Sequence, residues 1–392
     1  MSSLLQSPTL AETSHPLHSV QLPSDAYVLH LASLPLHYAA AASAPTHHIH
    51  LYDKISFQST LVFPGHEGGT TSLRAVDALA GTSRSLLLSS GRDSTVQVWD
   101  ERTGAVGVKM LQSSSASRAL LSCDVSPDGF TVAAGSELKG DEAQILFWDP
   151  RNPNAPLRVH SSTHSEDITI VEFSPPSNPS SSHNVLLSAS SDGLISLSNA
   201  EEDDEDEAVM QVGNWGCSIS QAGWIPRTNA EPRVWAASDM ETFSAWSEEL
   251  DLLSDLDIRS PSVHNQNRTW VTDYLIDCHA ACQSGLSVFT GSNEGDVALL
   301  RNANYFDRAS PWQLERLWIG GHSGVVRTIL WDEQASIVLS GGEDSKLHAW
   351  TCPQLPGDAD RGLAAASPYT RKRDHGDDDD DVEMGEIYFD NV

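Results

Sequence analysis

A unit of about fifty residues recurs along this chain, and the recurrence constrains the fold more than any other feature of the sequence. Each unit holds short runs of β-branched and apolar residues and ends at one marked position, which is usually aromatic. These positions are 47 to 54 residues apart, and they are Tyr52, Trp99, Trp148, Ser198, Trp246, Leu300 and Trp350. A self-similar chain of this kind folds as an array or a closed ring of equal modules.

The runs within each unit have the character of β-strands. "LLLSS" followed by "TVQVWD" is one example, and "TVAAG" followed by "ILFWD" is another. Turn dipeptides such as Asp128-Gly129 and Asp192-Gly193 separate them. About four such strands fit in one unit, which is the content of a propeller blade. The sequence therefore predicts an all-β fold, a seven-bladed β-propeller.

Two units carry the same four residues in the same order. They are His66, Ser89, Asp93 and Trp99 in one unit and His322, Ser340, Asp344 and Trp350 in the other. A third unit has His164, Ser188 and Asp192, with Ser198 at the aromatic position. Histidine, serine and aspartate are also the members of a hydrolase triad. A triad is expected once, in a cleft, whereas these sets recur at the spacing of the repeat, so we interpret them as structural.

In these features the chain resembles the WD-repeat family, over roughly residues 15 to 352. The resemblance implies that each set forms a hydrogen-bonded network within one blade. Asp344 would hold the imidazole of His322. That ring would reach Ser340, whose hydroxyl would meet the indole N–H of Trp350, and the other complete set would act alike. Buried polar groups have to be satisfied, so a complete network holds one blade geometry.

The same family closes its ring with a strand from the N-terminus. "HPLHSVQLP", His15 to Pro23, shows apolar alternation, and we expect it to form the outer strand of the last blade. The predicted organisation is a flexible segment over residues 1–14, the propeller over residues 15–352 and a disordered acidic tail over residues 353–392. The stretch Ser254–Arg268 lies in the longest interval between units and is expected to be a surface loop.

The formal net charge is −31, which disfavours nucleic acids and anionic membranes and favours basic partners. One acidic run should project as a loop and consists of Glu201, Glu202, Asp203, Asp204, Glu205, Asp206 and Glu207. It is either a solvated segment or a dock for a basic segment such as a histone or ribosomal-protein tail. The tail holds a second run, Asp377–Asp381, and a basic cluster, Arg371–His375, with the composition of a nuclear import signal.

The sequence predicts no catalytic, metal or cofactor site. Structural zinc needs about four ligands with paired spacing, whereas "CHAAC" (Cys278–Cys282) and "THHIH" (Thr46–His50) stand alone. Glycine-rich phosphate loops, HExxH and GxSxG are absent from the sequence. The first residues do not have the pattern of a signal peptide, and no run approaches the roughly 20 apolar residues that cross a bilayer. We therefore expect a location in the nucleus or cytoplasm.

Three hypotheses on function follow, and each describes a monomer that works within a complex of proteins. The first is a non-enzymatic scaffold, and the second is an acidic escort of a basic client. The third rests on "WDER" and "WDPR", which resemble the motif of substrate receptors for the cullin-4 ubiquitin ligase. In that family Arg102 or Arg151 would face the ligase adaptor. None of the three involves direct contact with nucleic acid or a membrane.

Overall fold

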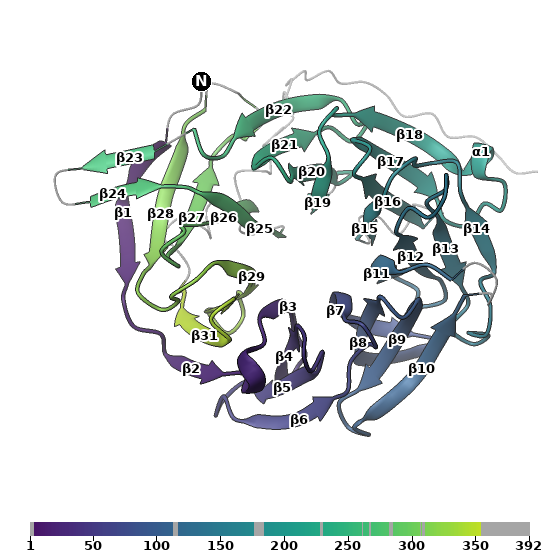
Figure 1. The fold of residues 1–392 in the computed structure, drawn as a ribbon. Coiled ribbons are helices and arrows are strands. Elements are labelled where there is room, and N and C mark those ends of the chain that lie inside the picture. The colour runs from purple at the N-terminus through teal and green to yellow at the C-terminus, as the bar shows by residue number, and fades with distance from the viewer. Residues whose placement is uncertain are drawn as a thin grey trace, which may run out of the picture.

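The strands form a closed ring around a central axis (Figure 1). The computed structural model describes residues 4–353, except 113–116, 176–183, 228–229, 261, 266–267, 282–284, 306 and 308–309. In this part of the chain seven sheets of four or five strands make the blades, and the prediction of an all-β, seven-bladed propeller is confirmed. The predicted acidic tail, with its basic cluster, lies outside the described residues beyond Pro353.

In each blade the strands that follow one another along the chain pair antiparallel and run in order from the axis to the rim (Figure 1). Blade one contains β3 (Val28–Ser33), β4 (His37–Ala42), β5 (Ile49–Asp53) and β6 (Ser59–Phe63). Blade two contains β7 (Thr70–Leu79), β8 (Thr82–Gly91), β9 (Thr95–Asp100) and β10 (Ala105–Leu111). Blade three contains β11 (Leu120–Val125), β12 (Val132–Ser136), β13 (Ile145–Trp148) and β14 (Arg158–His160).

The remaining blades follow the same plan. Blade four contains β15 (Ile168–Phe173), β16 (Val185–Ser190), β17 (Leu194–Asn199) and β18 (Val209–Asn214). Blade five contains β19 (Ile219–Ile225), β20 (Arg233–Ser238), β21 (Thr242–Trp246) and β22 (Leu252–Asp257). Blade six contains β25 (Tyr274–Ala281), β26 (Gly285–Gly291), β27 (Val297–Asn302) and β28 (Trp312–Trp318). Blade seven contains β29 (Val326–Asp332), β30 (Ile337–Gly342) and β31 (Lys346–Thr351).

The repeating positions of the sequence all fall on the third strand of a blade. Those strands are β5, β9, β13, β17, β21, β27 and β31. Because each blade is covered on both faces by its neighbours, these strands are largely buried on both sides. All four residues of β13, for example, are buried. The period in the sequence therefore reflects the layer in which the blades pack together.

Blade seven takes its fourth strand from the start of the chain. Strand β2 (His18–Gln21) pairs antiparallel with β31, with His18 opposite Ala349 and Gln21 opposite Lys346. The segment predicted to close the ring thus lies at the rim of the last blade, beside the strand that contains Trp350 (Figure 1).

The segment predicted to be flexible, residues 1–14, is instead mostly a strand. β1 (Leu4–Thr13) pairs parallel with β28 and makes blade six a sheet of five strands. Leu4 is buried in a cluster with Trp270 and Trp312. The prediction was wrong because this strand belongs to no repeat, and its partner lies some three hundred residues later in the chain.

The stretch predicted as a surface loop is also ordered. After the end of β22, the strands β23 (Ser262–Asn265) and β24 (Arg268–Val271) form a hairpin that projects from the ring beside β1 (Figure 1). Val263 and Trp270 of the hairpin pack in the same cluster as Leu4. The insertion therefore contributes to the core around β1.

Two short helical segments lie between strands. The 3-10 turn η1 (Pro23–Asp25) leads from β2 into the first blade, and α1 (Glu205–Ala208) lies between β17 and β18. Helices long and apolar enough to span a bilayer do not occur among the described residues.

Candidate functional site

The tetrad of blade seven joins two strands of the blade to a loop and a turn. His322 comes from the loop between β28 and β29, Asp344 from the turn after β30, and Ser340 and Trp350 from β30 and β31. His322 Nδ1 lies 2.9 Å from Asp344 Oδ1, and its Nε2 lies 2.8 Å from Ser340 Oγ. Trp350 Nε1 lies 2.9 Å from the same Ser340 oxygen. The four side chains form one continuous chain of hydrogen bonds.

The tetrad of blade two has the same geometry. His66 lies 2.8 Å from Asp93 and 2.7 Å from Ser89, and the Trp99 indole nitrogen lies 2.8 Å from Ser89 Oγ. A Cβ atom added to Gly91 would lie 2.3 Å from His66 Cγ, so the ring occupies space that only a glycine leaves open. Burial alone would raise the pKa of Asp93, but the hydrogen bond and charge of His66 bring it below its usual value.

The donors and acceptors fix the direction of these bonds. An indole nitrogen can only donate, so Trp350 donates to Ser340 Oγ. The Ser340 hydroxyl then donates a hydrogen bond to His322 Nε2, and the N–H at His322 Nδ1 donates a hydrogen bond to Asp344 Oδ1. Ser340 is 1 % exposed and Ser89 is fully buried. A nucleophilic serine has to reach its substrate, and these hydroxyl groups are enclosed and hold an indole.

The third set, in blade four, is incomplete. His164 Nε2 lies 2.8 Å from Ser188 Oγ, but its Nδ1 is 3.4 Å from Asp192, with a geometry too poor for a hydrogen bond. Asp192 instead accepts the backbone N–H groups of Ser165 and Leu194. No indole reaches Ser188 in the described part of this blade, because Ser198 occupies the aromatic position.

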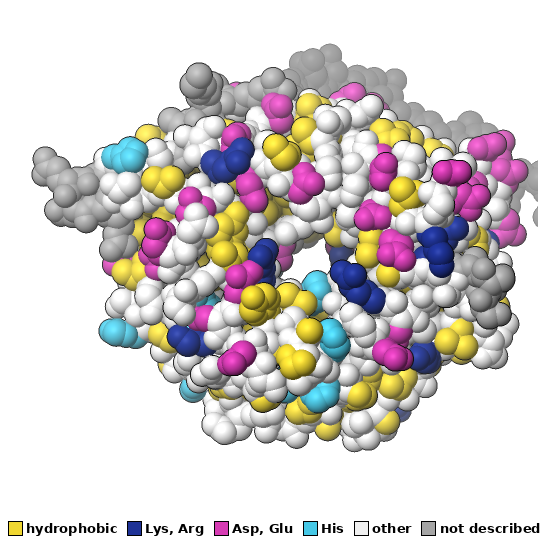
Figure 2. Space-filling model, viewed as in Figure 1, with side chains coloured by type: hydrophobic (Ala, Val, Ile, Leu, Met, Phe, Trp, Pro, Cys, Tyr) yellow, Lys and Arg dark blue, Asp and Glu magenta, His cyan; other side chains and the backbone are white. Residues whose placement is uncertain are grey.

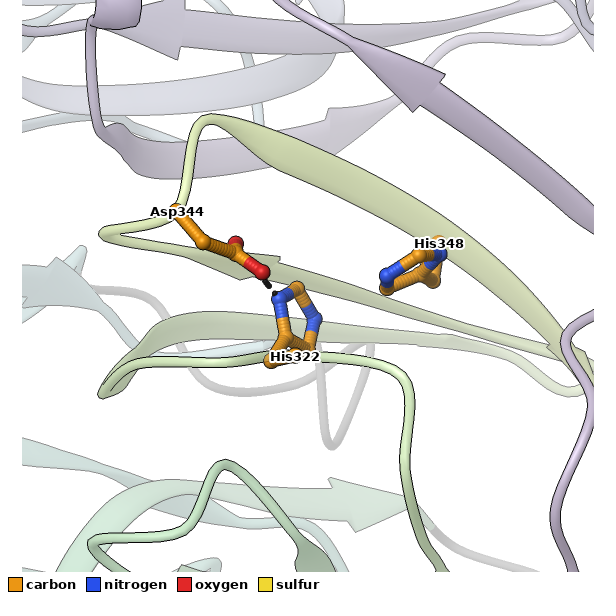
Figure 3. A group of neighbouring side chains, drawn as sticks. All are labelled: His322, Asp344 and His348. Carbon is orange, nitrogen blue, oxygen red and sulfur yellow. Dashed lines mark hydrogen bonds and ion pairs between the residues drawn. The ribbon is translucent and has the colours of Figure 1, made fainter.

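Blade seven also brings a second histidine close to its tetrad. The His348 ring faces that of His322, 4.5 Å away between centroids, and with Asp344 the two have the residue types of a metal site (Figure 3). His348 Nε2 lies 3.0 Å from the carbonyl oxygen of Gly321, to which it donates. Burial, with the His322 ring nearby, lowers the pKa of His348 to about 4. His348 Nδ1 has no hydrogen-bond partner, but a cation here would displace hydrogen bonds of His322 and Asp344, so we interpret the group as part of the polar core of the blade.

The inner strands surround a central cavity of about 540 Å³. Figure 2 shows the molecule hollowed at the centre of the ring, with charged side chains around the opening. Arg74 of β7 lies 3.3 Å from Glu172 of β15 and 3.6 Å from Asp124 of β11, so it joins three blades. Asp277 of β25 lines the same cavity. Sequence reasoning missed these residues; the only signal was a charged residue inside an apolar strand run.

The acidic run predicted to project as a loop is partly folded into the rim. Glu205, at the start of α1, accepts the backbone N–H groups of Ser161, Ser162 and Thr163 and the Thr163 hydroxyl at 2.6 to 2.8 Å. Burial alone would raise the pKa of Glu205, but these hydrogen bonds hold it below its usual value. Asp203 lies 3.4 Å from Arg158. The run is thus anchored between blades three and four.

The remaining acids of the run face solvent. Glu202 is half-buried and accepts the N–H groups of Asp203 and Asp204. The exposed members are Glu201, Asp203, Asp204, Asp206 and Glu207. The acidic run therefore has two parts. Glu205 forms hydrogen bonds that stabilise the fold, and the five exposed acids present negative charge at the rim.

The family model for "WD domain, G-beta repeat" matches two stretches of the chain, residues 57–100 and 314–351. These are the stretches that hold the two complete tetrads. The chain is a WD40-repeat protein. The remaining blades of this WD40 ring keep the strand pattern but have lost parts of the tetrad, which explains why the family model matches two units.

Relatives of this WD40 protein extend over most of its length. It is 29% identical over 353 residues to the WD repeat-containing protein GTS1 of Arabidopsis thaliana, which covers 86% of this chain and 85% of the relative. It is 27% identical over 345 residues to the WD repeat-containing protein 89 homolog of Dictyostelium discoideum, with 86% of each chain covered. An uncharacterized WD repeat-containing protein of Saccharomyces cerevisiae is 30% identical over 275 residues, or 69% of this chain and 65% of the relative. The seventh unit, Gly321–Trp350, and the tail "RKRDHGDDDDDVEM" also resemble WD repeat-containing protein 89.

The two Trp-Asp-x-Arg motifs of the WD40 ring form identical turns on adjacent blades. Arg102 lies 2.6 Å from Asp100, and Arg151 lies 2.7 Å from Asp149. Each guanidinium group thus pairs with the aspartate of its own motif. The side chains of Arg102 and Arg151 are 56% and 59% exposed, so both retain a face toward solvent.

Proposed function

We propose that this WD40 ring is a non-enzymatic scaffold that assembles protein complexes in the nucleus or cytoplasm. The observation that supports it best is the state of Ser89 and Ser340. Both hydroxyl groups are buried and bonded to an indole, so the residues that look catalytic in the sequence serve the blades. What is left for function is the surface of a rigid ring, and such rings commonly hold several protein partners.

Purification of the tagged full-length protein, followed by mass spectrometry, tests the proposal. We expect at least one partner at near-stoichiometric yield. Gly91→Ala places a methyl group against His66 and should loosen blade two, so we expect this variant to lose the partner. A protein that purifies alone from every extract would contradict the proposal. So would an enzymatic activity that the wild-type protein has and the Ser340→Ala variant lacks.

A second candidate function is that of an acidic escort for a basic client such as a histone or a ribosomal protein. The exposed acids of the rim run and the net charge of −31 support it. Complementary charge accelerates association and fails as salt rises. The client would be bound by the exposed acids, not by Glu205.

The test therefore neutralises Glu201, Asp204, Asp206 and Glu207 to their amides and leaves Glu205 in place. We expect a basic client to be lost from the purified complex and its binding to weaken with salt. Glu137→Gln, a half-buried acid in another blade, serves as the control. A client that is not basic, or one retained by the fourfold variant, would count against the escort.

The third candidate, a substrate receptor of the cullin-4 ubiquitin ligase, is supported by the exposure of Arg102 and Arg151 in matching turns. Co-purification with the ligase adaptor should be found for the wild-type protein and lost when both arginines are replaced by alanine. Arg259, which makes the same local turn with Asp257, provides a control outside the two motifs. A wild-type purification without the adaptor ends this candidate.

A further inference from the structure

The charged groups that line the central cavity are unevenly paired: both guanidinium groups bind carboxylates, and one carboxylate remains without an ion pair among the described residues. Its lining includes two carboxylates, Glu172 and Asp277, and two guanidinium groups, Arg74 and Arg327. Arg327 is already bonded to Glu343, at 2.7 Å from its Nε, and Arg74 is held by Glu172 and by Asp124 beyond the wall. The internal cations are therefore committed to other carboxylates.

Asp277 is the lining carboxylate left over. Among the described residues it accepts a hydrogen bond from the N–H of Cys278, 2.7 Å away, and no cation lies within ion-pair distance of it. Burial raises the pKa of Asp277 to about 6, although the Cys278 N–H and the charges of His279 and Arg74 act in the opposite direction. A carboxylate in such a place is stabilised as an anion if a cation enters the cavity.

The uncharged part of the lining also suits a side chain that carries a cation. Trp235 presents an indole, and Gln221 has a buried amide oxygen without a hydrogen-bond partner. Gly223 keeps this wall open, because a Cβ there would lie 2.9 Å from Trp235 Nε1 and 3.1 Å from Glu172 Oε2. The lining therefore offers a counter-ion, the Asp277 carboxylate, and a hydrogen-bond acceptor without a partner, the Gln221 amide oxygen.

We propose that the central cavity binds the basic side chain, lysine or arginine, of a protein partner, with Asp277 as its counter-ion and Trp235 and Gln221 in the wall. This rests on the proposed scaffold function and names the chemistry of one partner contact. The same cation could come from a free polyamine, which the test separates. The cavity volume of about 540 Å³ exceeds what one such side chain fills, so the water there remains part of the site.

Calorimetry with small probes on the full chain tests the site. The probes are Nα-acetyl-arginine N-methylamide, Nα-acetyl-lysine N-methylamide, the neutral norleucine analogue and spermidine. We expect the arginine or lysine probe to bind at least tenfold more tightly than norleucine, and Asp277→Asn to lose that preference. Asp141→Asn, an exposed acid outside the cavity, should bind as the wild type does. Equal binding of the norleucine probe, or unchanged binding by Asp277→Asn, would overturn the proposal. Tighter binding of spermidine would show that the cation comes from a free polyamine and not from a partner's side chain.

Two further readings keep the result interpretable. Asp277→Asn keeps the shape of the side chain, so its melting temperature should be no lower than that of the wild type, and the probe should raise only the wild-type value. Probe affinity should decrease as the pH falls below about 6, because Asp277 is then protonated. The other titratable or charged groups that line the cavity are Arg74, Glu172, His30, Cys278, His279 and Arg327. If the probes bind but purification yields no partner, the scaffold function is refuted and the cation site stands. If partners are found but no probe binds, the cation site is refuted and the scaffold function stands.

Discussion

Trp350 donates its indole hydrogen to the hydroxyl of Ser340 over 2.9 Å, and both side chains are almost fully buried. The same bond joins Trp99 to Ser89, whereas Ser188 of blade four has no indole in reach among the described residues. The third strand of blades two and seven is therefore tied to the second strand by a polar link that blade four lacks.

Replacement of Ser340 or Ser89 by alanine should destabilise the ring by about 1–3 kcal/mol each, because a buried indole N–H and a histidine nitrogen lose their partner. Ser188→Ala should cost less, since only His164 loses a bond. Chemical denaturation of the three variants measures the difference. Equal losses at all three positions would show that the indole link adds nothing.

Gly91→Ala should loosen blade two, because the new methyl group would overlap His66 at 2.3 Å from Cγ. Overpacking of this kind costs about 1–3 kcal/mol. Gly107→Ala, where the nearest atom is 3.7 Å away, is the matched control and should leave the melting temperature nearly unchanged. If both variants melt together, the tetrad tolerates a displaced histidine.

Glu205→Gln should destabilise the junction of blades three and four by about 1 kcal/mol, since a charged acceptor of several hydrogen bonds becomes neutral. The exposed Glu207→Gln should have no effect.

The pH dependence of that difference follows from the lowered pKa of Glu205. The contribution is complete above the pKa of the unfolded chain, about 4.3, and is lost as the pH falls through the lower folded value. Wild type and Glu205→Gln should therefore differ in melting temperature at pH 7 and converge as the pH falls through the folded pKa of Glu205. A constant difference across this range would show that the charge of Glu205 has no part in it.

A variant that begins at Ser14 should fold but lose the burial of Leu4, at a cost of about 1.5–3 kcal/mol. A variant that begins at Leu22 also loses β2 and exposes the outer edge of β31, so it should aggregate. Thermal unfolding and size-exclusion chromatography distinguish the two. A monomeric, stable product from the shorter chain would show that blade seven needs no fourth strand.

The repeat predicted the ring because each unit places one residue, such as Trp99 or Trp350, at the same point of the third strand. A local pattern repeated in this way reports local structure directly. β1 and Glu205 escaped prediction because their roles depend on contacts distant in sequence, with β28 and with residues 161–163. Asp277 escaped for another reason: each inner strand adds only a few residues to the cavity, so no stretch of sequence shows it.

The strands that finish the rim of the last two blades, β1 and β2, precede every other strand in the chain, while their partners lie between Trp312 and Thr351. A ribosome therefore synthesises the two partners of each pairing about three hundred residues apart. The early strands wait with exposed edges while the intervening blades assemble. Closure of the ring is consequently a late event, and the rims of blades six and seven are where a nascent ring is open to a chaperone or to a second, unfinished copy.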